Sequence, residues 1–218
     1  MALQASRSEF HRIRGLRYHL RRWGDPSRPT ILLLHGWLDV SETFHFMVQP
    51  WLDRWQVIAP DWRGFGYTEW QPGGYWFHDY LADLDELFAR ITGRDPVVLI
   101  GHSMGAQAAS LYAGLRPESI SHLCCLDGPF LVNMSGADAP RRVVGWLDQL
   151  RSPPRARHYT AFEQLAARVR LQHPQLSEER ALFIAHHEVV SIEGSGHMLH
   201  FDRPVETALA IRKFIESK

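Results

Sequence analysis

Short runs of largely apolar residues alternate with longer amphipathic segments along the first part of the chain. Residues 30–34, 56–60, 97–100 and 120–126 are runs of strand length, as expected for strands that helices cover on both faces. Between them, residues 77–91 place apolar side chains at helical spacing. Strands that alternate with helices predict βαβ units, so the fold class is α/β with a doubly wound, mostly parallel sheet.

The N-terminal quarter of the chain adds two elements to this pattern. Leu16 to Trp23 alternates as an antiparallel strand does, and a Gly-Asp-Pro turn at 24–26 closes it. Ser41 to Asp53 is expected to form a helix capped by Ser41. Met1 to Arg14 has no apolar centre and no later apolar run approaches spanning length, so we expect a cytoplasmic protein without a signal or membrane segment.

The pattern changes after the strand at 120–126. The chain becomes rich in arginine and is broken by prolines, with helices expected around residues 142–150, 162–171 and 177–185. Such a segment resembles a helical cap inserted over the carboxyl edge of the sheet, where it would shape a pocket and exclude water. The expected organisation is a core of residues 1–128 and 187–218 and a cap insertion of residues 129–186.

The composition and net charge of the chain limit which classes of binding partner are expected. The chain has 218 residues, 45% hydrophobic and 22% charged, and a formal net charge of zero, so neither nucleic acid nor an acidic membrane surface is an expected partner. Cys124 and Cys125 are adjacent in an expected strand, where neighbouring side chains point to opposite faces. We therefore expect free thiols, with neither a disulfide nor a metal site. Nothing in the composition assigns an oligomeric state.

A Gly-x-Ser-x-Gly motif at 101–105 follows the apolar run at 97–100 and precedes the Ala-rich residues 106–115. This order predicts a strand, a sharp turn and a helix, with Ser103 exposed on a strained backbone and the helix N-terminus directed at it. Ser103 is therefore the candidate nucleophile. The alternative is a Gly-rich turn with an incidental serine.

His35, Gly36 and Trp37 end the strand at 30–34. Backbone N–H groups of Trp37 and of Met104, next to Ser103, could converge on the oxygen of a tetrahedral intermediate and form an oxyanion hole. His35 and Gly36 are then expected to border the bound substrate. The alternative is a plain strand-to-helix turn in which Gly36 only relieves crowding.

Two further segments contain candidate site residues. His197 lies in a Gly-Ser-Gly-His-Met run after an expected strand at 188–192, and it follows Ser103 in the chain order that a serine triad takes at a strand-to-helix turn. We expect it to be the general base, although an isolated histidine is more often an ordinary core or surface residue. Asp61 and Arg63 lie in a Gly-rich loop and either orient substrate or, as we prefer, pair locally and hold that loop.

Taken together, the motifs resemble those of the α/β-hydrolase fold family, and within it the serine hydrolase-like proteins related to carboxylesterases. The resemblance implies a Ser-His-acid hydrolase without a cofactor. A serine at the nucleophile position is unlike the haloalkane dehalogenase and epoxide hydrolase branches, whose nucleophile is a carboxylate. The motifs are His35-Gly36-Trp37, Asp61-Trp62-Arg63-Gly64-Phe65-Gly66, Gly101-His102-Ser103-Met104-Gly105 and Gly194-Ser195-Gly196-His197.

One feature of the family pattern is missing. The family places a further strand, followed by the triad acid, between the cap and the last strand, whereas residues 181–187 pass almost directly into 188–192. Either the chain has lost that strand and part of its cap, or a stretch is omitted near His186 or His187. Asp127 is a substitute acid, because it ends the strand after the nucleophile helix, a position that some dehalogenases of this fold use. The alternative is that Asp127 caps the following Gly-Pro turn; Glu193 and Asp202 are weaker candidates.

These residues predict a serine hydrolase that acts on a small or medium carboxylic ester, a small-molecule substrate. Two alternatives stay open. The same triad could hydrolyse a carbon–carbon bond or catalyse perhydrolysis, and a chain that lacks the triad acid could bind a small ligand without converting it.

Overall fold

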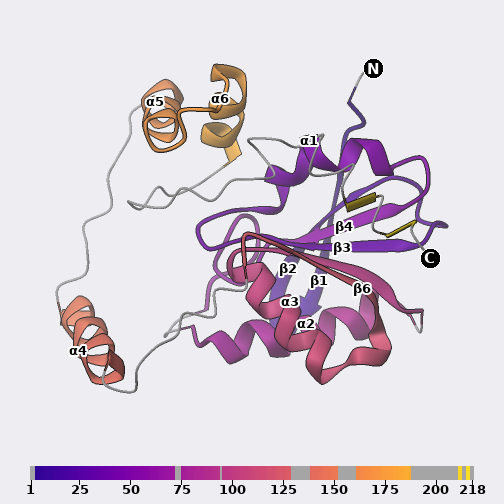
Figure 1. Ribbon diagram of the computed structural model, residues 1–218, viewed down its shortest axis with the longest axis horizontal. Coiled ribbons are helices and arrows are strands. Elements are labelled where there is room, and N and C mark those ends of the chain that lie inside the picture. The colour runs from indigo at the N-terminus through magenta and orange to yellow at the C-terminus, as the bar shows by residue number, and fades with distance from the viewer. Residues whose placement is uncertain are drawn as a thin grey trace.

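The computed structural model describes residues 3–71, 75–93, 95–128, 138–151, 161–187, 211–212 and 215–216. Within these ranges, strands form one sheet in the order β1-β2-β4-β3-β5-β6 (Figure 1). Four neighbouring strands, β4, β3, β5 and β6, run parallel, while β1 and β2 pair antiparallel at one edge. The mostly parallel sheet is as predicted. The strands are β1 (Arg7–Ile13), β2 (Leu16–Trp23), β3 (Thr30–Leu34), β4 (Gln56–Pro60), β5 (Val97–His102) and β6 (Ile120–Leu126).

Strand β1 was not predicted from the pattern. It forms a hairpin with β2, and the turn residues Arg14 and Gly15 have φ values of 44° and 85°. Positive φ at both central residues is typical of the two-residue turn that matches the twist of paired strands. The apolar residues Phe10 and Ile13 point to opposite faces of β1, so no alternation indicates the strand.

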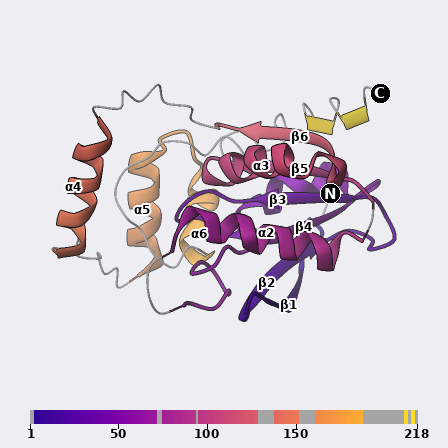
Figure 2. The same cartoon turned by 90° about the horizontal axis from the view of Figure 1, so that it is seen from below.

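Helices cover both faces of the sheet, which confirms the doubly wound arrangement. The helices α2 (Phe77–Ile91) and α3 (Met104–Leu115) lie side by side on one face (Figure 2). They bury Leu84, Leu87 and Ala108 against Leu32 and Leu99 of the sheet. After α3, a short 3-10 turn, η3 (Pro117–Ser119), leads into β6.

The opposite face is covered by short helical turns instead of the single helix expected over residues 41–53. The chain forms η1 (Ser41–Phe44), α1 (His45–Val48) and η2 (Gln49–Trp51), which bury Phe44 and Trp51 against the sheet. Pro50 lacks the amide hydrogen that an α-helix requires, so α1 cannot continue through it. Ser41 is not a side-chain cap; its amide donates to Oδ1 of Asp61 at 2.7 Å.

The C-terminal residues return to this second face. Ile211 and Ile215 are buried in the same apolar cluster as Trp51. The Arg212 guanidinium donates to the carboxylate of Asp53 at 3.2 Å. The described residues 211–212 and 215–216 are therefore packed on this face of the sheet.

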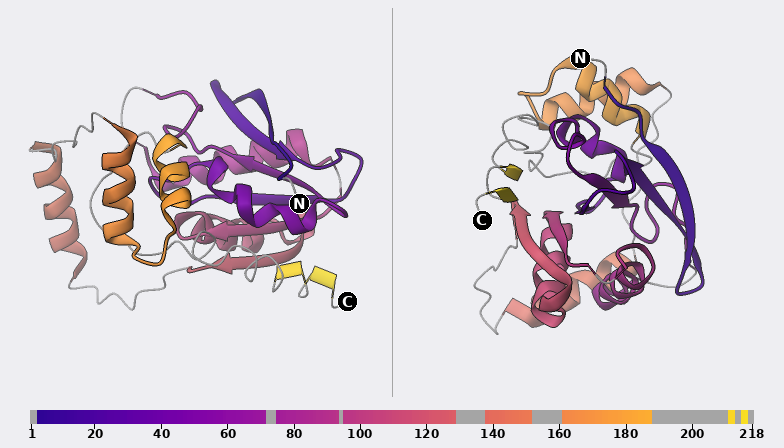
Figure 3. Two further views of the ribbon diagram at one scale, coloured as in Figure 1. Left: turned by 90° about the horizontal axis from the view of Figure 1, so that it is seen from above. Right: turned by 90° about the vertical axis from the view of Figure 1, so that its right-hand side faces the viewer.

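The expected cap helices are present as α4 (Asp138–Arg151), α5 (Phe162–Gln172) and α6 (Glu178–His187), beyond one end of the sheet (Figure 3). Helices α5 and α6 share an apolar cluster that includes Leu165 and Ile184. Phe183 of α6 stacks on His45, with ring centroids 5.7 Å apart, and packs on Phe46 at 4.9 Å. Through Phe183, α6 contacts the segment that follows β3.

The expected strand at 188–192, and with it the question of a lost late strand, lies outside the described residues. Among the residues that are described, Cys124 and Cys125 are free thiols. No described helix has both the length and the apolar character needed to cross a membrane.

Candidate active site

Ser103 occupies the turn between β5 and α3. Its φ and ψ are 50° and −114°, a backbone conformation that costs a non-glycine residue on the order of 1–3 kcal/mol. The amide of Ser103 donates to the carbonyl of Leu126 at 3.0 Å, which ties the turn to the end of β6. Ser103 is half-buried, and this bond and the strained turn hold its backbone in one conformation.

The glycines that flank this turn are required by close backbone contacts. A Cβ at Gly101 would lie 2.3 Å from the carbonyl oxygen of Gly105. A Cβ at Gly105 would lie 2.1 Å from the carbonyl oxygen of Leu34, at the end of β3. Only glycine allows the β5–α3 turn to pack this closely on itself and on β3.

The loop after β3 contacts the Ser103 turn. A Cβ at Gly36 would lie 3.3 Å from Cβ of Ser103 and 3.0 Å from Nδ1 of His102. Trp37 follows Gly36 and is 57% exposed. Met104 is the first residue of α3, where N–H groups have no acceptor within the helix. The structure thus brings together the two segments that contain the expected oxyanion-hole amides.

The His35 side chain is fully buried under this loop. Its Nε2 accepts a hydrogen bond from the amide of Trp62 at 2.9 Å, so the ring proton resides on Nδ1 and is donated to the carbonyl of Gly36 at 2.8 Å. The Trp62 indole in turn donates to the carbonyl of His35 at 2.9 Å. His35 therefore acts as a strut that holds the backbone at Gly36.

His102 and Asp39 are a buried pair next to the same loop. Both side chains are almost fully buried, and Nδ1 of His102 lies 4.0 Å from Oδ2 of Asp39. Oδ1 of Asp39 accepts the amide hydrogen of Val40 at 2.8 Å. His102 packs beneath the Ser103 turn. Asp39 is a site residue that the sequence interpretation missed, although a carboxylate shortly after the His-Gly pair could have indicated it.

Asp127 follows β6 directly and lies beside the nucleophile turn. It has a φ of 45°, a conformation that aspartate tolerates better than most residues, and its side chain is half-buried. A Cβ at the next residue, Gly128, would lie 3.1 Å from the carbonyl oxygen of Ser103. His197, the expected base, lies outside the described residues, as do Glu193 and Asp202.

The loop after β4 is held by Asp61 at its start. Oδ1 of Asp61 accepts the amide hydrogen of Ser41 at 2.7 Å, and Oδ2 accepts that of Tyr67 at 3.0 Å. Burial alone would raise the pKa of the Asp61 carboxyl, but hydrogen bonds from His19 and Ser41 outweigh burial and lower this pKa to about 2. The ionised Asp61 carboxylate therefore holds the loop in place by accepting hydrogen bonds from the backbone on both of its sides.

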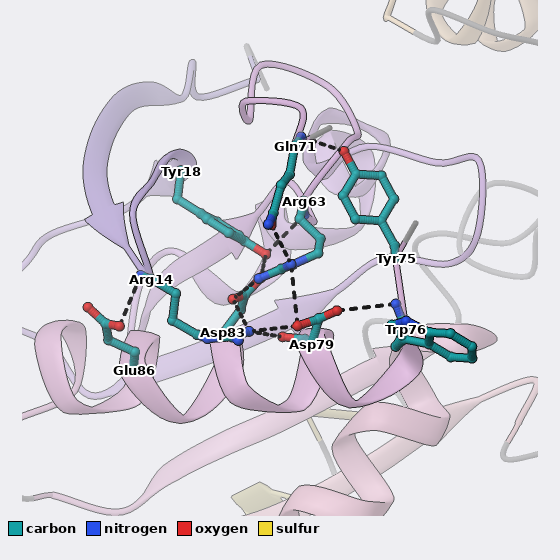
Figure 4. A network of polar contacts seen from close by, with 9 residues as sticks. All are labelled: Arg14, Tyr18, Arg63, Gln71, Tyr75, Trp76, Asp79, Asp83 and Glu86. Atoms are coloured by element: carbon teal, nitrogen blue, oxygen red, sulfur yellow. Dashed lines mark hydrogen bonds and ion pairs between the residues drawn. The ribbon is translucent and has the colours of Figure 1, made fainter. Parts of the chain in front are cut away.

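Arg63 fastens the same loop to α2 (Figure 4). Its guanidinium forms two hydrogen bonds with the carboxylate of Asp83, each 2.6 Å long. The hydroxyl of Tyr18 donates to Asp83 at 2.7 Å and accepts the amide hydrogen of Arg63 at 2.9 Å. Both Asp61 and Arg63 hold the loop, as preferred above, although the carboxylate partner of Arg63 lies on a separate helix.

This anchored loop supports the segment around Gly36. The Phe65 ring meets the Trp37 ring edge to face, with centroids 5.1 Å apart, and meets the His35 ring at 5.7 Å. The expected nucleophile, the expected oxyanion-hole segment and Asp127 consequently lie at one edge of the sheet, on three neighbouring strand ends. A group of His, Cys, Asp and Glu suited to a metal ion is not found among the described residues.

Comparisons with known proteins agree with this arrangement. A serine hydrolase-like protein of Danio rerio is 28% identical over 180 residues, which cover 79% of this chain and 55% of that protein. Epoxide hydrolase 4 of Homo sapiens is 29% identical over 117 residues, covering 53% of this chain and 32% of that protein. The chain thus spans about half the length of the Danio rerio relative.

Solved structures and a family model extend the comparison. The thioesterase domain from the curacin biosynthetic pathway superposes with a TM-score of 0.77 at 26% identity, covering 97% of this chain and 80% of that domain. A family model described as the alpha/beta hydrolase fold matches residues 29–168, more than half of the chain. With the Ser103 turn, the sheet order and these matches in agreement, the chain belongs to the alpha/beta hydrolase fold family.

Proposed function

We propose that this chain is a serine hydrolase that cleaves a small or medium carboxylic ester, with Ser103 as its nucleophile. The proposal rests on the strained backbone conformation of Ser103, whose φ is 50°, in the turn between β5 and α3. This turn is in contact with the segment at Gly36. Strain of this kind is maintained where surrounding structure holds a residue in place for function. Here the surrounding structure consists of close glycine contacts and the bond to Leu126.

In the proposed mechanism, Oγ of Ser103 attacks the ester carbonyl carbon while His197 accepts the hydroxyl proton. The amides of Trp37 and Met104 stabilise the negative charge on the tetrahedral oxygen. His197 then protonates the leaving alcohol, and water hydrolyses the acyl-enzyme by the reverse sequence of proton transfers. The chemistry needs no metal ion or cofactor.

Three further residues have supporting roles in the proposal. Asp127 would accept the Nδ1 hydrogen of His197, keeping the tautomer correct and stabilising the imidazolium. Its position directly after β6, beside the Ser103 turn, supports this role. Gly36 would border the substrate, with the buried His35 holding its carbonyl in place.

The serine at the nucleophile turn favours acyl chemistry over epoxide opening, whereas the names of the relatives include both classes. The Danio rerio relative is named a serine hydrolase-like protein, and the matching curacin structure is a thioesterase domain. Epoxide hydrolases also match, but a serine occupies the nucleophile turn here, whereas the resemblance noted above associates epoxide hydrolases with an aspartate. We therefore place oxygen esters and thioesters ahead of epoxides as substrates.

The test is hydrolysis of p-nitrophenyl acetate and of a short acyl thioester by the purified chain and its Ser103→Ala variant. Ser110→Ala is the matched control, because Ser110 lies on α3 and its hydroxyl bonds only the helix carbonyl of Ala106 and the thiol of Cys125 among its described contacts. We expect Ser103→Ala to abolish turnover and Ser110→Ala to retain it. A folded chain that hydrolyses neither compound would favour the ligand-binding alternative. Steady-state turnover beyond one equivalent of product that survives Ser103→Ala would contradict the assignment of the nucleophile.

A further inference from the structure

A second serine–histidine–aspartate arrangement lies at the β1–β2 edge of the sheet. Oγ of Ser8 is 2.9 Å from Nε2 of His19, and Nδ1 of His19 is 2.7 Å from Oδ2 of Asp61. Ser8 is exposed, whereas His19 and Asp61 are buried. We propose that Ser8, His19 and Asp61 form a second nucleophilic centre, whose serine takes up an acyl group from an activated ester.

The hydrogen bonds of Asp61 determine which nitrogen of His19 can act as a base. Asp61 is an ionised carboxylate that also accepts the amide hydrogens of Ser41 and Tyr67, so it can only accept from His19. The proton of a neutral His19 ring therefore resides on Nδ1. The lone pair of Nε2 then faces the Ser8 hydroxyl, as a general base faces its nucleophile.

The base and the acid are held in a rigid frame. The amide of Asp61 donates to the carbonyl of His19 at 3.0 Å, and the amide of His19 donates to Oγ1 of Thr68 at 2.9 Å. The Thr68 hydroxyl donates in turn to the carbonyl of Asp61 at 2.7 Å. A Cβ at Gly66 would lie 2.2 Å from Oδ2 of Asp61, so the loop closes tightly over the carboxylate. Preorganisation of this kind keeps the imidazole aimed at Ser8.

The surface around Ser8 suits an aryl or acyl group. The rings of Phe10 and Tyr67 flank His19, each with its centroid 5.2 Å from that of the imidazole, and they are 43% and 66% exposed. Arg21 lies directly opposite Ser8 on β2, and its guanidinium donates to the hydroxyl of Ser6 at 2.8 Å. The ion pair of Arg21 with Glu42 offsets the positive charge that the arginine brings to this side of the sheet, so we expect slower acylation than at Ser103.

The chemical step is an ordinary acyl transfer. Oγ of Ser8 forms a bond to the carbonyl carbon of the ester while its proton moves to Nε2 of His19. The bond from that carbon to the leaving oxygen breaks, and the leaving group takes the proton from His19, which leaves an acyl ester on Ser8. Strands β1 and β5 are four strand spacings apart in the sheet, roughly 19 Å, so this reaction is independent of Ser103.

The experiment uses a fluorophosphonate probe on the full chain carrying Ser103→Ala. Attack by Ser8 forms a bond from oxygen to phosphorus and expels fluoride, and the adduct is located by mass spectrometry on the tryptic peptide of residues 8–12. Ser27 is the internal control, because its exposed hydroxyl donates to a carboxylate, that of Asp25, at 2.8 Å, with no imidazole among its described contacts. We expect Ser8 to be labelled at least tenfold faster than Ser27.

Two variants complete the test. Ser8→Ala, an exposed substitution that should not impair folding, is expected to remove the label, and His19→Gln is expected to slow it to the rate of Ser27. If His19→Gln does not fold, the ratio of Ser8 to Ser27 labelling decides alone. Labelling of Ser8 no faster than Ser27 would overturn the proposal. Labelling of Ser103 in the unmodified chain is measured on a different peptide, so failure of one centre is distinguishable from failure of the other.

Discussion

Arg63 and Asp83 form a buried bidentate ion pair that joins the loop after β4 to α2, with both hydrogen bonds 2.6 Å long. The Arg63 side chain is almost fully buried and that of Asp83 is completely so. Tyr18 completes the arrangement from β2, and Arg14 reaches the same carboxylate at 3.2 Å (Figure 4). Charges removed from water in this way are tolerated only when each is paired.

Asp83→Asn should therefore destabilise the chain strongly. It leaves the Arg63 guanidinium buried without its full counter-charge, and we expect the free energy of unfolding to fall by about 3–5 kcal/mol in urea titrations. The matched control is Asp148→Asn, which removes an exposed ion pair with Arg151 on α4 and should cost less than about 1 kcal/mol. Equal losses in the two variants would show that the buried pair contributes no more than a surface one.

Replacement of two glycines of α3 by alanine should change the stability of the chain in opposite directions. Gly105→Ala would bring its Cβ to 2.1 Å from the carbonyl oxygen of Leu34, so the variant should lose several kcal/mol or fail to fold. A Cβ at Gly114 would meet no atom of the described residues within 4 Å beyond its own helix backbone and chain neighbours, and Gly114→Ala should raise stability by about 0.5–1 kcal/mol. Thermal unfolding of both variants measures the difference, and a stable Gly105→Ala would contradict the close contact between α3 and β3.

Asp61 should make stability depend on acid pH. Its pKa in the folded chain, about 2, lies below the usual value of 3.8, so the unfolded chain binds more protons between these values. The resulting stabilisation is complete above about pH 4 and is lost as the pH falls towards 2, a change of about 2 kcal/mol. In urea titrations from pH 6 to pH 2, the free energy of unfolding should fall less for Asp61→Asn than for the unmodified chain. An equal fall in both chains would exclude an ionised, hydrogen-bonded Asp61.

Asp127→Asn tests the acid of the proposed triad. Asparagine tolerates the φ of 45° at this position, so the fold should survive and the melting temperature should change little. If Asp127 orients His197, kcat for a p-nitrophenyl ester should fall by about 10³–10⁴-fold, as expected when a triad acid becomes an amide. Asp148→Asn, which removes an exposed carboxylate on α4, is the control and should leave kcat unchanged. A kcat for Asp127→Asn within threefold of the unmodified chain would assign Asp127 to the loop alone.

Local rules accounted for the nucleophile turn. The apolar run, the glycine spacing and the following alanines predicted strand, turn and helix around Ser103, and the structure has β5, a positive φ and α3 at those positions. The close approach of Gly101 to Gly105 acts within a few residues, so the sequence motif contains it, whereas the contact of Gly105 with Leu34 does not. The helices at 138–151, 162–172 and 178–187, which we interpret as a cap, likewise followed from composition and helical spacing.

The missed elements have identifiable physical causes. Strand β1 is half exposed, and its pairing with β2 depends on a positive φ at Arg14, which the residue type does not indicate. Pro50 could have predicted the break in the helix expected over 41–53. The sequence could not predict that the buried His35 supports the backbone at Gly36, because its partner Trp62 lies 27 residues away.

The sequence by itself determined the fold class, the nucleophile turn and the segments that meet around it, because apolar periodicity and glycine spacing act over short stretches of chain. Only the tertiary structure decided which polar groups meet. Ser8, His19 and Asp61 come from β1, β2 and the end of β4, and Asp83 reaches Arg63 from a separate helix. Which of these side chains meet depends on strand order and register. No periodic pattern in the sequence predicts these contacts.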